Sequence, residues 1–123
     1  MSNLNDSVSY ILEKGAQLIA ISPELSQNAD EFASNTSTEF PIISDPTNTI
    51  MNAFDVTFKA TDAYSDRIMN RYEVSIADNN GSEEAFLPVP ATYIIQPDGT
   101  INYVHFDLNY RRRASVKDIL SNL

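Results

Sequence analysis

The first residues of the chain combine a helical hydrophobic pattern with a strand-like one. Gly15 stands where a helix would end. One face of this expected helix, with spacing i, i+4, i+7 and i+8, carries Leu4, Val8, Ile11 and Leu12. The near-continuous apolar run AQLIAIS follows at residues 16–22, which is typical of a strand buried on both faces of a parallel sheet. We therefore expect a helix and then a core strand.

A second helix and a second strand complete a strand–helix–strand unit. Ser22-Pro23 is a typical helix start, because serine caps the first turn and proline suits its first position. The apolar face of this helix would consist of Leu25, Ala29, Phe32 and Ala33. FPIIS, residues 40–44, predicts a second strand that runs parallel to the first through a right-handed crossover. Asp45-Pro46 then opens a short third helix.

Residues 55–86 show the weakest pattern in the chain. Tyr64, Ile68 and Tyr72 are spaced at i, i+4 and i+8, which predicts a helix near 62–72. ADNNGSEE, residues 77–84, reads as a polar loop. We interpret 55–86 as an irregular or helical insertion within a single domain that spans 1–123.

The clearest local signal is LPVPATYIIQPDGTI, residues 87–101. It predicts a strand at 91–96, a Pro-Asp-Gly turn at 97–99 with glycine at a position of positive φ, and a return strand at 100–106. A last helix follows, for which Ser115 is the expected cap and Asp118 lies three residues later, as in a capping box. We read Asp45, Asp62 and Asp118 as structural helix-start residues.

Composition and charge exclude several classes of function. The chain has 123 residues, a net charge of −9, no cysteine, three glycines and one histidine, His105. The negative charge disfavours nucleic acid and anionic membranes as partners. Without cysteine there is no disulfide, thiolate metal site or cysteine nucleophile, and no glycine-rich phosphate loop is present. We expect no cofactor and no metal, and the lack of an apolar leader or spanning segment predicts a cytoplasmic protein.

Four segments taken together carry a family resemblance. They are GAQLIAISPE, FPIISDPTNTIMNAFDVTF, LPVPATYIIQPDGTINYVHFD and YRRRASVKDIL, in this order along the chain. The chain resembles the alkyl hydroperoxide reductase and thiol-specific antioxidant (AhpC/TSA) family, and most closely its peroxiredoxin-like branch with a C-x-x-C site. The resemblance implies an α/β thioredoxin-like (peroxiredoxin-type) sheet with flanking helices, on which a cysteine thiolate reduces peroxides or other oxidised substrates.

The resemblance also implies that parts of this fold are missing. In the family, the nucleophile lies on a strand and a helix start that precede the segment matching residues 4–15, so we expect an incomplete domain without the first core strand and without the start of the nucleophile helix. The implied sheet order is 40–44, 16–22, absent strand, 91–96, 100–106. Strands 16–22 and 91–96 would then expose unpaired backbone groups. They would pair directly, bind a second copy to form a homo-oligomer, or belong to a longer product.

Candidate site residues follow from the same resemblance. Pro90, after Val89, matches the cis-proline that faces the active-site thiol in this fold, whereas a plain strand-edge role for Pro88 and Pro90 stays open. Arg112 and Arg113 match an arginine pair of the family and suit anion binding, but such residues more often pair with their own carboxylates, here Asp107 or Asp118.

His105 has two interpretations as well. A structural histidine on the return strand is favoured over a proton-transfer group. Tyr93 and Tyr103 are expected to make cross-strand contacts in the hairpin.

Two functions of different classes follow. The first is a thiol-dependent antioxidant oxidoreductase that reduces a peroxide or an oxidised thiol in a full-length relative, and that is inactive as this cysteine-free chain because the attacking atom is absent. The second is a non-catalytic thioredoxin-like module for association or regulation, or a truncated gene product. An in-frame strand followed by C-x-x-C upstream of the Met1 codon would favour the first.

Overall fold

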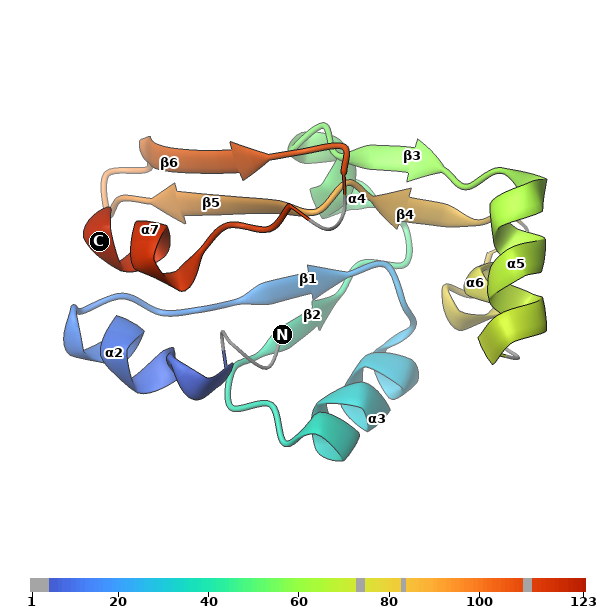
Figure 1. The fold of residues 1–123 in the computed structure, drawn as a ribbon, viewed down its shortest axis with the longest axis horizontal. Coiled ribbons are helices and arrows are strands. Elements are labelled where there is room, and N and C mark those ends of the chain that lie inside the picture. Colours follow the sequence, from blue (N-terminus) through green and yellow to red (C-terminus); the bar gives the residue numbers. More distant parts are fainter. Residues whose placement is uncertain (1–4, 73–74, 83, 110–111) are drawn as a thin grey trace.

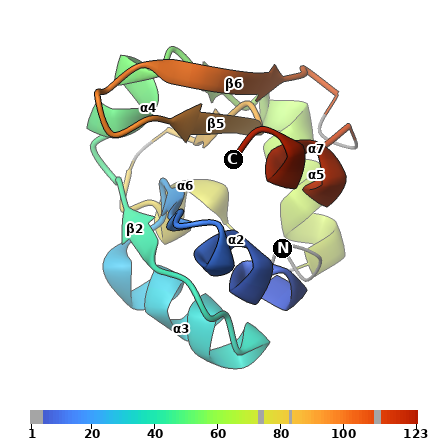
Figure 2. The same ribbon diagram turned by 90° about the vertical axis from the view of Figure 1, so that its left-hand side faces the viewer.

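The computed structural model describes residues 5–72, 75–82, 84–109 and 112–123, and these form short helices and three pairs of strands. Figure 1 shows the strand pairs spread across the molecule, and Figure 2 shows the helices arranged around them. In chain order the elements are α2 (Val8–Glu13), β1 (Ala20–Ser22), α3 (Ser26–Thr36), β2 (Ile42–Ser44), α4 (Thr49–Ala53), β3 (Thr57–Lys59), α5 (Asp62–Tyr72), α6 (Ile76–Asn79), β4 (Phe86–Pro88), β5 (Ala91–Ile95), β6 (Ile101–Phe106) and α7 (Val116–Ser121).

The predicted strand–helix–strand unit is confirmed, with a correction to the start of its helix. β1 and β2 are parallel, with Ala20 opposite Ile42, and α3 connects them. The helix begins at Ser26 and not at Ser22-Pro23. The reason is that Ser22 belongs to the ladder: its carbonyl accepts the Asp45 N–H at 2.7 Å, and its hydroxyl accepts the Glu24 N–H at 3.2 Å. The chain therefore bends at Pro23 and Glu24 before α3 begins.

The C-terminal hairpin and the last helix also follow the prediction. β5 and β6 are antiparallel from Ala91 opposite Phe106 to Ile95 opposite Ile101, with a register shift between Ile94 and Ile95. Ser115 caps α7 by accepting the Asp118 N–H at 3.1 Å. The hairpin and α7 thus form where local turn and capping chemistry is strongest.

Residues 55–86 are more regular than their pattern indicates. The expected helix is present as α5, but β3 and β4 form an antiparallel pair that local periodicity does not predict. Part of the expected polar loop is the one-turn helix α6, which begins because Ser75 accepts the Asp78 N–H at 3.2 Å. A strand of three residues that pairs across about thirty others leaves no local signal. The division into one domain with an insertion stays a prediction.

The buried apolar residues are distributed along the chain, and one cluster of them lies around α4. Met51, Val56 and Val89 form one buried cluster, against which Phe54 and Ala91 pack. None of the large side chains in the described ranges is fully buried. No helix in the described part of the chain is both long and apolar enough to span a bilayer.

β1 is less buried than predicted. The side chain of Ile21 is 36% exposed and that of Ile19 is 50% exposed, so the expectation of a strand covered on both faces is wrong. Among the described residues, β1 pairs with β2 alone and β5 pairs with β6 alone, and no hydrogen bond joins β1 to β5. Direct pairing of these two strands, one of the outcomes foreseen from the sequence, is therefore not found.

Candidate functional site

The Val89–Pro90 segment is held firmly at the junction of β4 and β5. Val89 is 8% exposed, and its N–H donates to the Val56 carbonyl at 2.7 Å. The side chain packs against Met51 in the buried cluster, while Pro90 is half-buried. Pro90 is therefore positioned by the burial and the hydrogen bond of the residue before it.

The Val89–Pro90 peptide bond is trans, as are all peptide bonds in the described ranges, so the cis bond expected from the resemblance is not found. The hydrogen bond from the Val89 N–H to the Val56 carbonyl holds the backbone beside β3 at the end of β4. The trans peptide bond then leads from Val89 through Pro90 into β5. The alternative of a strand-edge role is compatible with the position of Pro88, the last residue of β4, which pairs with Thr57.

α4 contributes to the same buried cluster through Met51. The buried Asp45 carboxylate accepts the N–H groups of Ile50 at 3.2 Å and Met51 at 2.9 Å, which fixes the first turn of α4. At the end of α4, the Phe54 ring lies 4.7 Å from the Tyr93 ring, and the Tyr93 hydroxyl donates to the Phe54 carbonyl at 3.3 Å. Asp45 therefore has a structural role at the start of a helix, but α4 begins at Thr49, after the N-cap residue Asn48, and not at Asp45-Pro46 as expected.

The open end of the hairpin brings several predicted residues together. Because Ala91 pairs with Phe106, Pro90 and Asp107 lie at the same end of the β5–β6 ladder. His105 is joined to this end as well, since its Nε2 lies 2.7 Å from the Arg112 carbonyl oxygen and donates to it. The bond ties the segment after β6 to the hairpin.

Of the predicted arginine pair, Arg112 forms an ion pair with a carboxylate of this chain. Arg112 Nη1 lies 4.0 Å from Asp107 Oδ2, as in the pairing alternative, and the arginine side chain is largely exposed. Such an exposed pair contributes little, about 0–1 kcal/mol. Arg113 is exposed and has an interaction of its own, and Arg111 lies outside the described residues. Anion binding at Arg112 and Arg113 stays a prediction.

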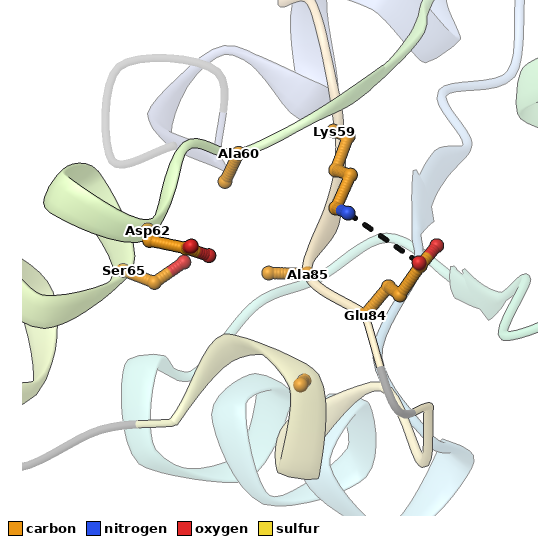
Figure 3. Close-up of a pocket in the computed structure, with 7 residues that line it drawn as sticks. Lys59, Ala60, Asp62, Ser65, Glu84 and Ala85 are labelled. Atoms are coloured by element: carbon orange, nitrogen blue, oxygen red, sulfur yellow. Dashed lines mark hydrogen bonds and ion pairs between the residues drawn. The ribbon is translucent and has the colours of Figure 1, made fainter.

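A shallow cavity that the sequence did not predict lies at the other end of β3 and β4. Figure 3 shows its polar rim, where Lys59 Nζ lies 3.4 Å from Glu84 Oε1, and where Asp62 and Ser65 project from α5. The cavity has a volume of about 210 Å³, and alanines form much of its wall, namely Ala60, Ala77 and Ala85. Its wall comes from β3, α5, α6 and the segment before β4, so no contiguous motif could have indicated it.

The side chains around this cavity do not make a hydrolytic site. No histidine lies beside Ser65, because the only histidine of the chain, His105, donates to Arg112 on the hairpin. In the described ranges, no three His, Asp or Glu side chains are grouped closely enough to hold a metal ion. The described residues thus give this cavity neither a serine–histidine pair nor a metal-binding cluster.

Two carboxyl groups have shifted pKa values, for different reasons. Partial burial raises the pKa of Glu24, which follows β1, above its ordinary value of 4.5. Hydrogen bonds from the Thr100 hydroxyl and then from the Thr100 N–H lower the pKa of Asp98 in the exposed hairpin turn. Both shifts therefore follow from local burial and local hydrogen bonds.

Comparison with known proteins supplies the family. No curated protein matches the chain. The solved structure of bacterioferritin comigratory protein from Xanthomonas campestris, described in connection with alkyl peroxide reduction, is similar with a TM-score of 0.64 and 17% sequence identity, which shows a shared fold. The match covers 98% of this chain and 60% of that protein. The sequence model of the AhpC/TSA family matches residues 1–104, and the chain therefore belongs to the AhpC/TSA family, although it contains no cysteine.

Proposed function

We propose that this chain has part of the fold of a thiol peroxidase but no nucleophile of its own. We also propose that it does not turn over peroxide by itself. The observation that carries the proposal is membership of the AhpC/TSA family together with a cysteine count of zero. Peroxide reduction in a thiol peroxidase requires a thiolate that attacks the peroxide oxygen and becomes a sulfenic acid. No other side chain here supplies this chemistry.

We expect the described fold to serve peroxide reduction only if a thiol is supplied from outside these 123 residues. Val89 and Pro90 are the proposed scaffold residues, because they are held at the junction of β4 and β5 by the cluster around Val56. The substrate class would be a peroxide, with alkyl peroxides suggested by the activity described for the Xanthomonas campestris protein. The cytoplasmic location predicted from the sequence stays a prediction.

A peroxide-consumption assay tests the proposal. The pure chain is incubated with hydrogen peroxide or an alkyl hydroperoxide and a dithiol reductant, and we expect no turnover above the protein-free rate. The chain has three methionines, which oxidise without turning over, so consumption that stops at three equivalents counts as methionine oxidation. Sustained consumption in proportion to protein concentration would refute the proposal.

Association with another polypeptide is a second candidate function. It is supported by the open edges of β1 and β5 and by the exposed apolar side chains near them, among them Ile19, Ile21 and Ile95. Open strand edges recruit further strands. Sedimentation velocity of the chain, alone and mixed with a candidate partner polypeptide, tests this function. A faster-sedimenting species would indicate association, whereas a monomer under both conditions would argue against it.

A further inference from the structure

The turn that joins α6 to β4 contains a chemically labile pair of residues. Asn80-Gly81 is the only asparagine–glycine step in the chain. An asparagine deamidates when the backbone nitrogen of the next residue attacks its side-chain carbonyl carbon. Glycine has no Cβ and leaves this approach the most open. Among the asparagines of the chain, Asn80 therefore has the strongest intrinsic tendency to deamidate.

The folded turn blocks this attack at both reacting groups. The Asn80 ψ of −4° places the Gly81 nitrogen beside the Asn80 nitrogen and away from the side chain, so ring closure requires rotation about ψ. The Gly81 N–H donates to the Asp78 carbonyl at 3.1 Å, and Asn80 Nδ2 donates to the Phe86 carbonyl at 2.8 Å. The nucleophile and the leaving group are thus both held in hydrogen bonds that must break before the reaction.

The same turn is anchored to the start of α3. The Asn79 carbonyl accepts the Leu25 N–H at 2.8 Å and Asn28 Nδ2 at 2.9 Å. The Leu25 side chain lies against Gly81, where an added Cβ would come within 2.8 Å of Leu25 Cδ2. Asn80 itself is 4% exposed. Rotation about its ψ would displace a peptide that is held by α3 on one side and by β4 on the other, so the turn has to open first.

We propose that Asn80 is a deamidation site that the closed α6–β4 turn protects and that local opening of this turn makes reactive. In the open turn the Gly81 nitrogen forms a bond to Asn80 Cγ, and the Cγ–Nδ2 bond breaks. Nδ2 leaves as ammonia and carries away the proton that the Gly81 nitrogen loses. Water from the solvent then opens the succinimide ring to give aspartate or isoaspartate. This chemistry goes beyond the proposed function and involves no thiol.

Deamidation prevents the turn from closing again in its original form. An aspartate carboxylate has no N–H to donate, so the Phe86 carbonyl loses its partner and faces a negative charge at a position that is 4% exposed. A buried charge without a partner is unfavourable. Isoaspartate also lengthens the backbone between Asn79, which is bonded to α3, and β4. Each conversion therefore marks a chain in which the junction of α3, α6 and β4 has opened.

Ageing of the folded and the unfolded chain tests the protection. The chain is kept in mildly alkaline buffer with and without guanidinium chloride, and deamidation of each asparagine is followed by peptide mapping and an isoaspartate assay. We expect Asn80 to react at least about tenfold more slowly in the folded chain, because only the open fraction reacts. In guanidinium chloride, Asn80 should react faster than Asn28 and Asn52, which each precede an alanine.

Two serine caps provide a matched pair of variants. Ser75 Oγ accepts the Asp78 N–H at the start of α6 at 3.2 Å, and Ser115 Oγ accepts the Asp118 N–H at the start of α7 at 3.1 Å. Figure 1 shows α6 and α7 toward opposite ends of the molecule. We expect Ser75→Ala to raise the folded-state rate at Asn80 at least about threefold, and Ser115→Ala to change it by less than about twofold.

The effect of the product is measured with Asn80→Asp, and Asn79→Asp is the control for the added charge. Asn79 is more exposed than Asn80, and its carbonyl bonds to α3 do not depend on its side chain. We expect Asn80→Asp to lower the urea midpoint and to speed amide exchange of Gly81 at least about fivefold. Asn79→Asp should leave both close to the values of the parent.

Several results would overturn the proposal. They are equal rates at Asn80 in the folded and unfolded chain, no preference for Asn80 in guanidinium chloride, a rate in Ser75→Ala no higher than in Ser115→Ala, and an Asn80→Asp variant as stable as the parent. Because no readout involves a peroxide or a thiol, these experiments and the peroxide assay fail or succeed independently.

Discussion

Replacing Asp45 by alanine should destabilise the fold through α4. The side chain is 4% exposed, and its two carboxylate oxygens accept the N–H groups of Ile50 and Met51 at 3.2 and 2.9 Å. Alanine leaves both donors without their partner at the first turn of the helix. Loss of a helix cap costs about 0.5–2 kcal/mol, and hydrogen bonds to charged groups contribute about 1.5–3 kcal/mol. We therefore expect Asp45→Ala to lower the free energy of unfolding by about 2 kcal/mol.

Urea denaturation followed by circular dichroism measures this loss. With a slope of about 2 kcal/mol per molar urea, the midpoint should fall by about 1 M. Asp45→Asn keeps one acceptor oxygen and should lie between the parent and Asp45→Ala. The exposed Asp30 of α3 is the matched control, since Asp30→Ala should change stability by less than about 0.5 kcal/mol.

Amide exchange separates a local effect from general destabilisation. The Met51 N–H should exchange faster in Asp45→Ala than the global loss of stability explains, whereas the Ile119 N–H, which donates to Ser115 in α7, should follow the global change. The reasoning is refuted if Asp45→Ala stays within about 0.5 kcal/mol of the parent, or if Met51 exchange is unchanged.

Three further predictions follow from burial and backbone geometry. Val89→Ala should cost about 2 kcal/mol in urea denaturation, because it removes two buried methyl groups from the cluster around α4; an unchanged midpoint would contradict this packing. Burial raises the pKa of Glu24, so the folded state favours the protonated carboxyl. Glu24→Gln should therefore be more stable than the parent at pH 7, and this gain in stability should disappear as the pH falls below 4.5. A gain that does not depend on pH would point to another cause. Gly15 and Gly81 both have positive φ, but a Cβ at Gly81 would also lie 2.8 Å from Leu25 Cδ2. Gly81→Ala should therefore lower the melting temperature more than Gly15→Ala, in which only the backbone penalty of about 1–2 kcal/mol applies, and equal decreases would argue against the contact.

Much of the candidate site could be predicted from the sequence, but its geometry could not. The positions of Val89 and Pro90 before the hairpin follow from local proline and turn signals, and the pairing of Arg112 with Asp107 was one of two stated alternatives. The bond from His105 to the Arg112 carbonyl gave no signal, because it depends on how the chain turns after β6. The cavity beside Lys59 was equally hidden, since its wall comes from segments far apart in the sequence.

The sequence by itself determined the features that depend on neighbouring residues. Gly99 and Ser115 act through bonds that span a few residues, so the hairpin turn and the start of α7 could be read directly. The cysteine count of zero likewise excluded a thiolate nucleophile within these 123 residues, because no arrangement of other side chains supplies one.

Only the tertiary structure decided which strand edges are used. The run at 16–22 is apolar enough for a strand covered on both faces, yet only Ala20–Ser22 forms a strand and Ile21 stays exposed. Burial of a strand is a property of its neighbours, and among the described residues β1 has a strand partner on one side alone. The apolar pattern of a segment indicates which side chains could be buried. The arrangement of distant strands decides which of them are buried.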